Sequence, residues 1–346
     1  MSSPAINSAP KDSATVILVR RAHGKTLEVF LARRHVSQSF MAGAFVFPGG
    51  KLEAADADFA LTKLISAKDD FHPHSLLQDN ALTKKMALSF FICAIRETFE
   101  ETGVLFARTK SGHSIDFGNA IIKSRFAAYR RSLNLGNITL TEIARQEELI
   151  LMPALLIPYS HWITPEIVPK RFSTRFFLAE LPVNQTATTD RDELTSSLWV
   201  TPHDALQMHI AGKITLMPPT LKTIEEMTKF ISVYTLSLSK DNEAARRRLR
   251  RRINNTLRKP TTQACAGQAL PTKLAKESEG VLDKLFAAAR NRSIYPIMPQ
   301  PMKNGLMLPH DPEYSIERYK QPVRSGEHSR FLITEGKWQC AEFPDE

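Results

Sequence analysis

Four charged residues near the middle of the chain have types and spacings that could do chemistry. Arg96, Glu97, Glu100 and Glu101 stand close together in one segment. In an α-helix, positions i, i+3 and i+4 lie on one face, so the three carboxylates would be neighbours. Clustered carboxylates repel one another unless a cation neutralises them, and hard divalent cations such as Mg²⁺ prefer oxygen ligands of this kind. The spacing therefore indicates a metal-binding helix face, with Arg96 paired to one carboxylate.

The helix that must carry this cluster is expected at about residues 82–102. Gly103 follows the cluster directly and is typical of the residue that ends a helix. Phe91, Ile95 and Phe99 form an apolar opposite face, which favours a helix packed on a core. The alternative is a solvated helix face with ordinary surface glutamates. The apolar face on the other side of the helix disfavours that alternative, because it indicates a helix packed on the core.

The order of these features resembles the signature of the Nudix hydrolase family. That signature has a glycine, five residues, a glutamate, seven residues, and then Arg-Glu-aliphatic-x-Glu-Glu-x-Gly-aliphatic. Gly50, after Phe-Pro-Gly, corresponds to the first glycine, and the segment from Arg96 to Val104 corresponds to the second half. Asp56 stands where the family has glutamate, Thr98 replaces the first aliphatic residue, and 39 residues follow Asp56 where the family has seven. The match is thus a Nudix box interrupted by an insertion.

Within the family, the interrupted box resembles the acyl-coenzyme A diphosphatase branch of the nucleoside diphosphate-linked moiety X motif 19 type. The resemblance rests on five stretches: 39–56, 92–105, 161–165, 171–178 and 216–219. It covers about residues 13–233. It implies an α/β fold, a Nudix α/β/α sandwich with a mixed β-sheet, here with a helical insertion and a C-terminal extension.

The resemblance also implies roles for individual residues in the attack of water on a diphosphate. Metal ligands for Mg²⁺ or Mn²⁺ would be Glu97, Glu100, Glu101 and the Gly50 carbonyl. Catalytic roles would fall to Glu97, Glu100, Arg96 and Glu193. The general base is Glu97 or Glu100, with Glu193 as a second candidate for base or ligand, and spacing alone does not choose among them.

The substrate implied by the branch is coenzyme A or an acyl-coenzyme A, giving 3′,5′-ADP and (acyl)phosphopantetheine. A 3′-phosphate and a diphosphate need cations, and an acyl or pantetheine arm needs apolar contacts. The candidate substrate-binding residues are Arg34, Phe40, Arg171, Arg175 and Met217. Surface charge and apolar core are the alternative roles for these residues. The alternative substrates are ADP-ribose, NADH and nucleotide sugars. A non-catalytic Nudix-like nucleotide-binding regulator is less favoured, because the chain keeps all three glutamates.

The remaining pattern predicts the organisation of the chain. Residues 13–233 would form the Nudix domain, in which residues 57–89 are an insertion of short helices and loop. Residues 234–278 would form a basic linker or helix. Residues 279–346 would form a C-terminal extension with little periodicity. Two strands, residues 14–20 and 27–33, are expected to form a hairpin. Further strands are expected at residues 44–47, 155–164, 172–181 and 198–201. Further helices are expected at residues 117–132, 139–148, 202–210 and 219–233.

Composition limits the other possibilities. The net charge of +10 includes six arginines within Arg246–Arg252, a run that could contact nucleic acid or acidic lipid, although a solvated basic helix is favoured. Three cysteines without a Cys-x-x-Cys pair disfavour a zinc site and a disulfide framework. There is no apolar run of membrane-spanning length and no signal-like N-terminus, so we expect a cytoplasmic protein. The insertion at residues 57–89 could cap the site or mediate a homodimer.

Overall fold

The computed structural model describes residues 9–22, 26–37, 41–65, 71–189, 194–238, 280–302, 305–311, 314–321, 330–334 and 337–341. Two candidate site residues, Phe40 and Glu193, lie outside these ranges, as does the arginine run 246–252. Their expected roles therefore stay predictions.

A mixed β-sheet forms the centre of the molecule. Its main path runs β10-β7-β8-β1-β2-β3, with β4 paired to β1 and β9 paired to β2. The strands are β1 (Lys11–Arg21), β2 (Leu27–Arg34), β3 (Phe45–Val46), β4 (Gly49–Lys51), β7 (Ile157–Ile163), β8 (Phe172–Glu180), β9 (Leu194–Val200) and β10 (Pro296–Ile297). β1 and β2 are antiparallel, which confirms the predicted hairpin, whereas β1 and β8 are parallel. The mixed sheet confirms the expected α/β fold class.

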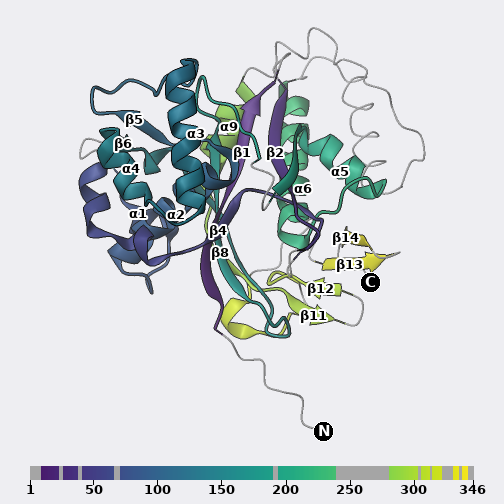
Figure 1. Ribbon diagram of the computed structural model, residues 1–346. Coiled ribbons are helices and arrows are strands. Elements are labelled where there is room, and N and C mark those ends of the chain that lie inside the picture. Colours follow the sequence, from purple (N-terminus) through teal and green to yellow (C-terminus); the bar gives the residue numbers. More distant parts are fainter. Residues whose placement is uncertain are drawn as a thin grey trace.

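Helices cover both faces of this sheet (Figure 1). One face carries α1 (Pro73–Leu77), α2 (Lys84–Thr102), α3 (Ala120–Asn134) and α4 (Leu140–Gln146). The other carries α5 (Pro202–Ile210), α6 (Pro218–Leu238) and α9 (Val281–Arg290). β1 is apolar on both sides for this reason: Val16 and Leu18 belong to the cluster under α2, and Ile17 and Val19 belong to the cluster under α6.

The insertion between β4 and α2 consists of short helical pieces, as expected. It contains the 3₁₀ helices η1 (Ala54–Ala57) and η2 (Phe59–Leu64), followed by α1. Leu61 and Leu77 are buried in the cluster under α2, so the insertion adds to the core of the domain. α2 itself begins at Lys84, close to the predicted start.

The C-terminal part is more ordered than its sequence pattern suggested. α9 packs on the face opposite α2, and β10 joins the main sheet parallel to β7. A second sheet has the order β11 (Gln300–Met302), β12 (Gly305–Met307), β13 (Arg330–Thr334) and β14 (Lys337–Ala341). The strands have three to five residues, which is too short for a clear period-two pattern.

The smaller elements complete the fold. β5 (Ala107–Thr109) pairs with β6 (Leu149–Leu151), and two further 3₁₀ turns are η3 (Pro153–Leu155) and η5 (Glu317–Tyr319). Within the ranges that the structure describes, no helix combines the length and apolar character needed to cross a membrane.

Candidate active site

Helix α2 holds the charged cluster in a defined position. Its N-terminus is capped by Thr83, whose hydroxyl accepts a hydrogen bond from Met86 N at 3.1 Å. Gly103 ends it in the left-handed conformation, with φ of 74°. Ile92, Ile95 and Phe99, on the side of the helix away from the glutamates, are at most 1% exposed. The backbone under the glutamates is therefore fixed by a cap at each end and by the core.

Arg96 lies at the centre of the cluster and is itself 4% exposed. Its Nε and Nη2 donate to Asp56 Oδ1 and Oδ2 at 2.8 and 2.9 Å, and Nη2 also donates to Lys51 O at 2.8 Å. Its Nη1 donates to both Glu97 Oε1 and Glu100 Oε2 at 2.9 Å. The guanidinium thus joins three carboxylates, where the sequence pattern led us to expect one.

The Phe-Pro-Gly-Gly turn packs directly on the acidic face of α2. Gly49 N donates to Glu101 Oε2 at 2.8 Å. A Cβ on Gly49 would lie 2.3 Å from Ala14 O, and a Cβ on Gly50 would lie 2.4 Å from Glu97 Cδ. Both glycines are needed because backbone and carboxylate approach too closely for any side chain. This contact brings the first glycine of the interrupted box beside its glutamates.

The carboxylates carry more negative charge than the local guanidinium neutralises. Burial raises the pKa of Glu97 to about 8, and repulsion from Glu100 adds to this, while Arg96 opposes it. Burial likewise raises the pKa of Glu100 to about 7, with Arg96 again opposing. Burial lowers the pKa of Arg96, but the hydrogen bond to Asp56 and the negative charges of Glu97 and Asp56 together raise it above its ordinary value, so Arg96 stays charged.

The donor set fits a divalent cation in its chemistry. Asp56, Glu97 and Glu100 share the single Arg96 guanidinium, and Glu101 lies on the same helix face. A cation would relieve the repulsion that, in addition to burial, raises the pKa values of Glu97 and Glu100. In the described part of the chain, no three acidic, histidine or cysteine side chains already converge on one point as a preformed cage. The hydrogen bonds of Arg96 and Gly49 account for the present directions of these carboxylates.

Asp56 is the residue that sequence reasoning missed. It was noted only as a departure from the signature, yet it is 2% exposed and binds Arg96 through both carboxylate oxygens. It also accepts from Glu53 N at 2.8 Å and so orders η1. Its position in the sequence could have indicated this role. It is an acidic residue at the glutamate position of the signature, and its side chain is one methylene shorter than that of glutamate.

Two of the candidate substrate-binding arginines are buried in other contacts. Arg175 is 4% exposed and forms an ion pair with Asp79, from the insertion. Arg171 is 6% exposed; its Nε donates to Thr164 O at 3.1 Å and its Nη2 lies 3.8 Å from Met298 Sδ. Both guanidinium groups therefore tie segments of the fold together.

The other two described candidates lie on accessible edges. Arg34 is half-buried at the end of β2, where its backbone N donates to Ala44 O at 3.0 Å. Met217 is half-buried and follows Leu216, which bridges to Phe45 of β3. β3 leads into the glycine turn, so Met217 lies on a segment adjoining that turn.

Comparison with known proteins agrees with this fold and arrangement. A Nudix hydrolase from Alicyclobacillus acidocaldarius superposes with a TM-score of 0.51 at 25% identity, over 63% of this chain and 91% of that one. A family profile described as the NUDT19 Nudix domain matches residues 10–227. The chain therefore belongs to the Nudix hydrolases, and within them to the NUDT19 type.

Named relatives of that type align over the same part of the chain. The acyl-coenzyme A diphosphatase NUDT19 of Xenopus laevis is 30% identical over 236 residues, and that of Homo sapiens is 28% identical over 237 residues. Each alignment covers 60% of this chain and 62% of the relative. The chain thus matches less than two thirds of the length of these relatives.

Proposed function

We propose that this chain hydrolyses a diphosphate bond in a nucleoside diphosphate linked to another moiety, with the help of a divalent metal ion. The observation that carries the proposal is the contact between the Gly49-Gly50 turn and the acidic face of α2. It places the turn against Glu97 and Glu101, while the buried guanidinium of Arg96 binds Glu97 and Glu100. The alignment with diphosphatases over residues of the Nudix domain supports the same reaction class.

In this proposal, Glu97, Glu100, Glu101 and the Gly50 carbonyl hold Mg²⁺ or Mn²⁺. The cation, when bound, acidifies a water molecule and offsets charge on the diphosphate. Arg96 keeps the carboxylates in place through its bonds to Asp56, because the buried pair fixes the direction of the whole side chain.

The general base is Glu97 or Glu100, whose raised pKa values of about 8 and about 7 suit proton uptake near neutrality. Glu193 stays a candidate from the sequence alone.

Coenzyme A or an acyl-coenzyme A is the proposed substrate. The named relatives support it, as does the resemblance of the interrupted box to that branch. Arg34 and Met217 remain candidates for contacts with the phosphate and the acyl or pantetheine arm. Arg171 and Arg175 are not proposed as substrate ligands, because their guanidinium groups are buried in structural contacts.

Mass analysis of the products tests both the bond cleaved and the substrate. The chain is incubated with Mg²⁺ or Mn²⁺ and a panel of coenzyme A, an acyl-coenzyme A, ADP-ribose and NADH. We expect 3′,5′-ADP and (acyl)phosphopantetheine, and no product when a chelator is present. A strong preference for ADP-ribose or NADH would replace the substrate while keeping the reaction class. No hydrolysis across the panel would favour a nucleotide-binding regulator.

The variant Glu101→Gln tests the role of the cluster. Glutamine keeps an acceptor for Gly49 N, so the fold should be retained, but the loss of a ligand charge should reduce turnover by about 100-fold or more. Glu317→Gln is the matched control, because that side chain is 80% exposed, and its activity should be unchanged. Near-normal turnover in Glu101→Gln, with unchanged thermal unfolding, would remove Glu101 from the mechanism.

A further inference from the structure

The C-terminal strand β14 lies beyond residues 10–227, the part of the chain that matches the Nudix profile, yet it contacts the Nudix domain. The contact is made through His209, near the end of α5, which is 3% exposed. Its Nε2 lies 2.7 Å from Trp338 O of β14, and its Nδ1 lies 3.2 Å from Leu216 N. One buried side chain therefore joins β14 to the segment that ends at Met217.

We propose that His209 is a positioning residue through which β14 holds residues 214–217 against β3, and with them the substrate side of the Nudix site. Thr215 O accepts a hydrogen bond from Phe45 N of β3 at 2.9 Å, and Leu216 forms a bridge to the same residue. The step from this segment to the substrate rests on the proposed function, in which Met217 is a candidate contact for the acyl or pantetheine arm.

The hydrogen bonds define the state of the His209 ring. Leu216 N–H can only donate, so Nδ1 is the acceptor, and Trp338 O can only accept, so Nε2 carries the proton. Nδ1 also lies 3.3 Å from Ile214 O, and in this tautomer the two atoms are in contact without a hydrogen bond. A neutral ring with its donor and its acceptor both engaged holds β14 and Leu216 in one relative position.

The strand β14 is itself held against the domain. Lys337 Nζ donates to Ile210 O, at the end of α5, at 3.3 Å. Phe331 of β13, which lies opposite Cys340 of β14, is fully buried, and its ring lies 6.4 Å from that of Trp162 in β7. The backbone of β14 therefore gives the ring of α5 a fixed partner.

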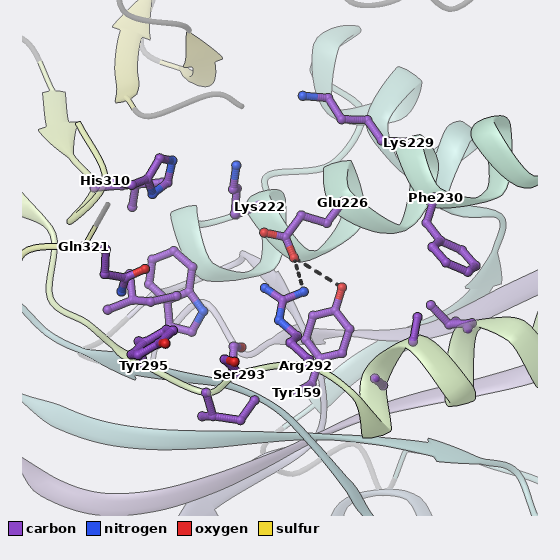
Figure 2. A pocket seen from close by; sticks show the side chains of 18 residues that line it. Tyr159, Lys222, Glu226, Lys229, Phe230, Arg292, Ser293, Tyr295, His310 and Gln321 are labelled. Atoms are coloured by element: carbon purple, nitrogen blue, oxygen red, sulfur yellow. Dashed lines mark hydrogen bonds and ion pairs between the residues drawn. The ribbon is translucent and has the colours of Figure 1, made fainter. Parts of the chain in front are cut away.

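The chain that leads to β14 is anchored on α6 and on the main sheet (Figure 2). Arg292, just after α9, donates through Nη1 to Glu226 Oε2 of α6 at 2.9 Å, and Tyr159 Oη of β7 donates to the same oxygen at 3.2 Å. β10 then pairs with β7. The C-terminal chain is thus joined to the domain before it reaches β14, so the position of β14 is set relative to the sheet.

The two sides of the site are held by different contacts. The glycine turn is fixed by the pairing of β4 with β1 and by the hydrogen bond from Gly49 N to Glu101 Oε2. These contacts do not involve residues 214–217. Loss of the His209 hydrogen bonds should therefore weaken substrate binding and raise KM, while the glutamates keep their positions and kcat changes little.

Steady-state hydrolysis of an acyl-coenzyme A by the full chain, with Mg²⁺ present, tests the inference. His209→Leu is close to the ring in size but removes both hydrogen bonds. We expect KM to rise about tenfold, with kcat within about twofold of the parent value. His209→Gln supplies an acceptor and a donor again, so its KM should stay within about threefold of the parent value.

Leu285→Ala is the matched control for lost stability. Leu285 is 3% exposed on α9, in the same core cluster as Leu216, and it takes no part in the His209 hydrogen bonds. Its Tm should fall because truncation leaves a cavity, while its KM stays at the parent value. A role in stability alone would lower the fraction of active protein, and so the apparent kcat, but not KM.

Lys337→Met keeps His209 intact and loosens β14 at Ile210, so it covers the case in which His209→Leu does not fold. Its KM should rise about threefold. Lys284→Met, at an exposed position of α9, is its matched control and should leave KM unchanged.

Amide hydrogen exchange reports the position of this segment without any hydrolysis. Exchange in peptides that cover residues 214–217 should quicken about tenfold in His209→Leu and stay at the parent rate in Leu285→Ala. Three results would overturn the inference: an unchanged KM in both His209→Leu and Lys337→Met, an equal KM in His209→Leu and His209→Gln, or unchanged exchange in His209→Leu. If the parent chain hydrolyses nothing, the proposed function fails, and the exchange rates still decide whether β14 holds this segment.

Discussion

Replacing Asp56 by asparagine tests whether the buried pair with Arg96 holds the site together. The two side chains are 1% and 5% exposed, and two hydrogen bonds of 2.8 and 2.9 Å join them. Asparagine is isosteric but presents an NH₂ group to a guanidinium donor, so one hydrogen bond is lost and a charge is left buried. Such removal of one partner commonly costs about 3–5 kcal/mol.

The lower end of that range is expected here, because Glu97 and Glu100 continue to bind Arg96. About 3 kcal/mol corresponds to a fall in Tm of roughly 6–12 °C for a domain of this size. Urea denaturation followed by circular dichroism measures the free energy of unfolding, and thermal denaturation measures Tm. Hydrolysis should also fall, since Arg96 would no longer be fixed in direction.

Asp283→Asn is the matched control. It also removes an aspartate from an arginine, Arg21, at 3.1 Å, but the side chains are 74% and 40% exposed. An exposed ion pair contributes at most about 1 kcal/mol, because water and salt screen it. If Asp56→Asn lowers the free energy of unfolding no more than Asp283→Asn does, burial of the Arg96 pair does not carry the stability assigned to it.

Three further predictions concern the site and its pH dependence. Gly50→Ala should reduce hydrolysis at least about tenfold, because its Cβ would lie 2.4 Å from Glu97 Cδ and displace the carboxylate. Gly118→Ala is the control: its Cβ would meet only the end of the Asp116 side chain, so full activity should remain in the same assay. Glu97 has a folded pKa of about 8, above its ordinary value of 4.5, so the metal-free protein should lose stability as pH rises from 4.5 to about 8, and this loss should level off above 8. Thermal denaturation should show this loss in the parent chain and not in Glu97→Gln, and equal pH profiles would contradict it. Burial and the positive charge of Arg175 lower the pKa of His161 to about 3. The stability that neutral His161 contributes should therefore be lost as pH falls from 6.5 towards 3. The Tm of His161→Gln should fall less steeply with acid than that of the parent chain, and parallel profiles of Tm against pH would refute this.

The elements with local signals were predictable from the sequence. The hairpin of β1 and β2 has one apolar run on each side of a turn. Helix α2 has an apolar face and a terminal Gly103, so its periodicity and its end signal agree. The helices α5 and α6 each begin at a proline, a residue favoured in the first turn of a helix. These features depend on residues a few positions apart, which is the range over which sequence patterns are informative.

The long-range contacts were not predictable in the same way. Asp56 and Arg96 are 40 positions apart, and Arg175 and Asp79 are 96 apart, so no spacing rule connects them. Arg171 and Arg175 were assigned to the substrate because arginines near a phosphate site suggest that role. Their burial became apparent only from the packing of the insertion and of the C-terminal chain against β8. The short strands β11 to β14 likewise depend on pairing with one another.

The Asp56–Arg96 pair also bears on how this branch could have gained its insertion. The two residues stand immediately before and shortly after the inserted chain, so their contact closes it into a loop whose ends are fixed. In the limit of a flexible chain, closing 39 residues in place of seven costs only about 1.5 kcal/mol of additional entropy. The burial of Leu61 and Leu77 from this segment offsets that cost. The buried bidentate pair holds both ends of this segment beside the glutamates. A segment fixed at its base in this way can differ in length or composition with little effect on the position of Arg96.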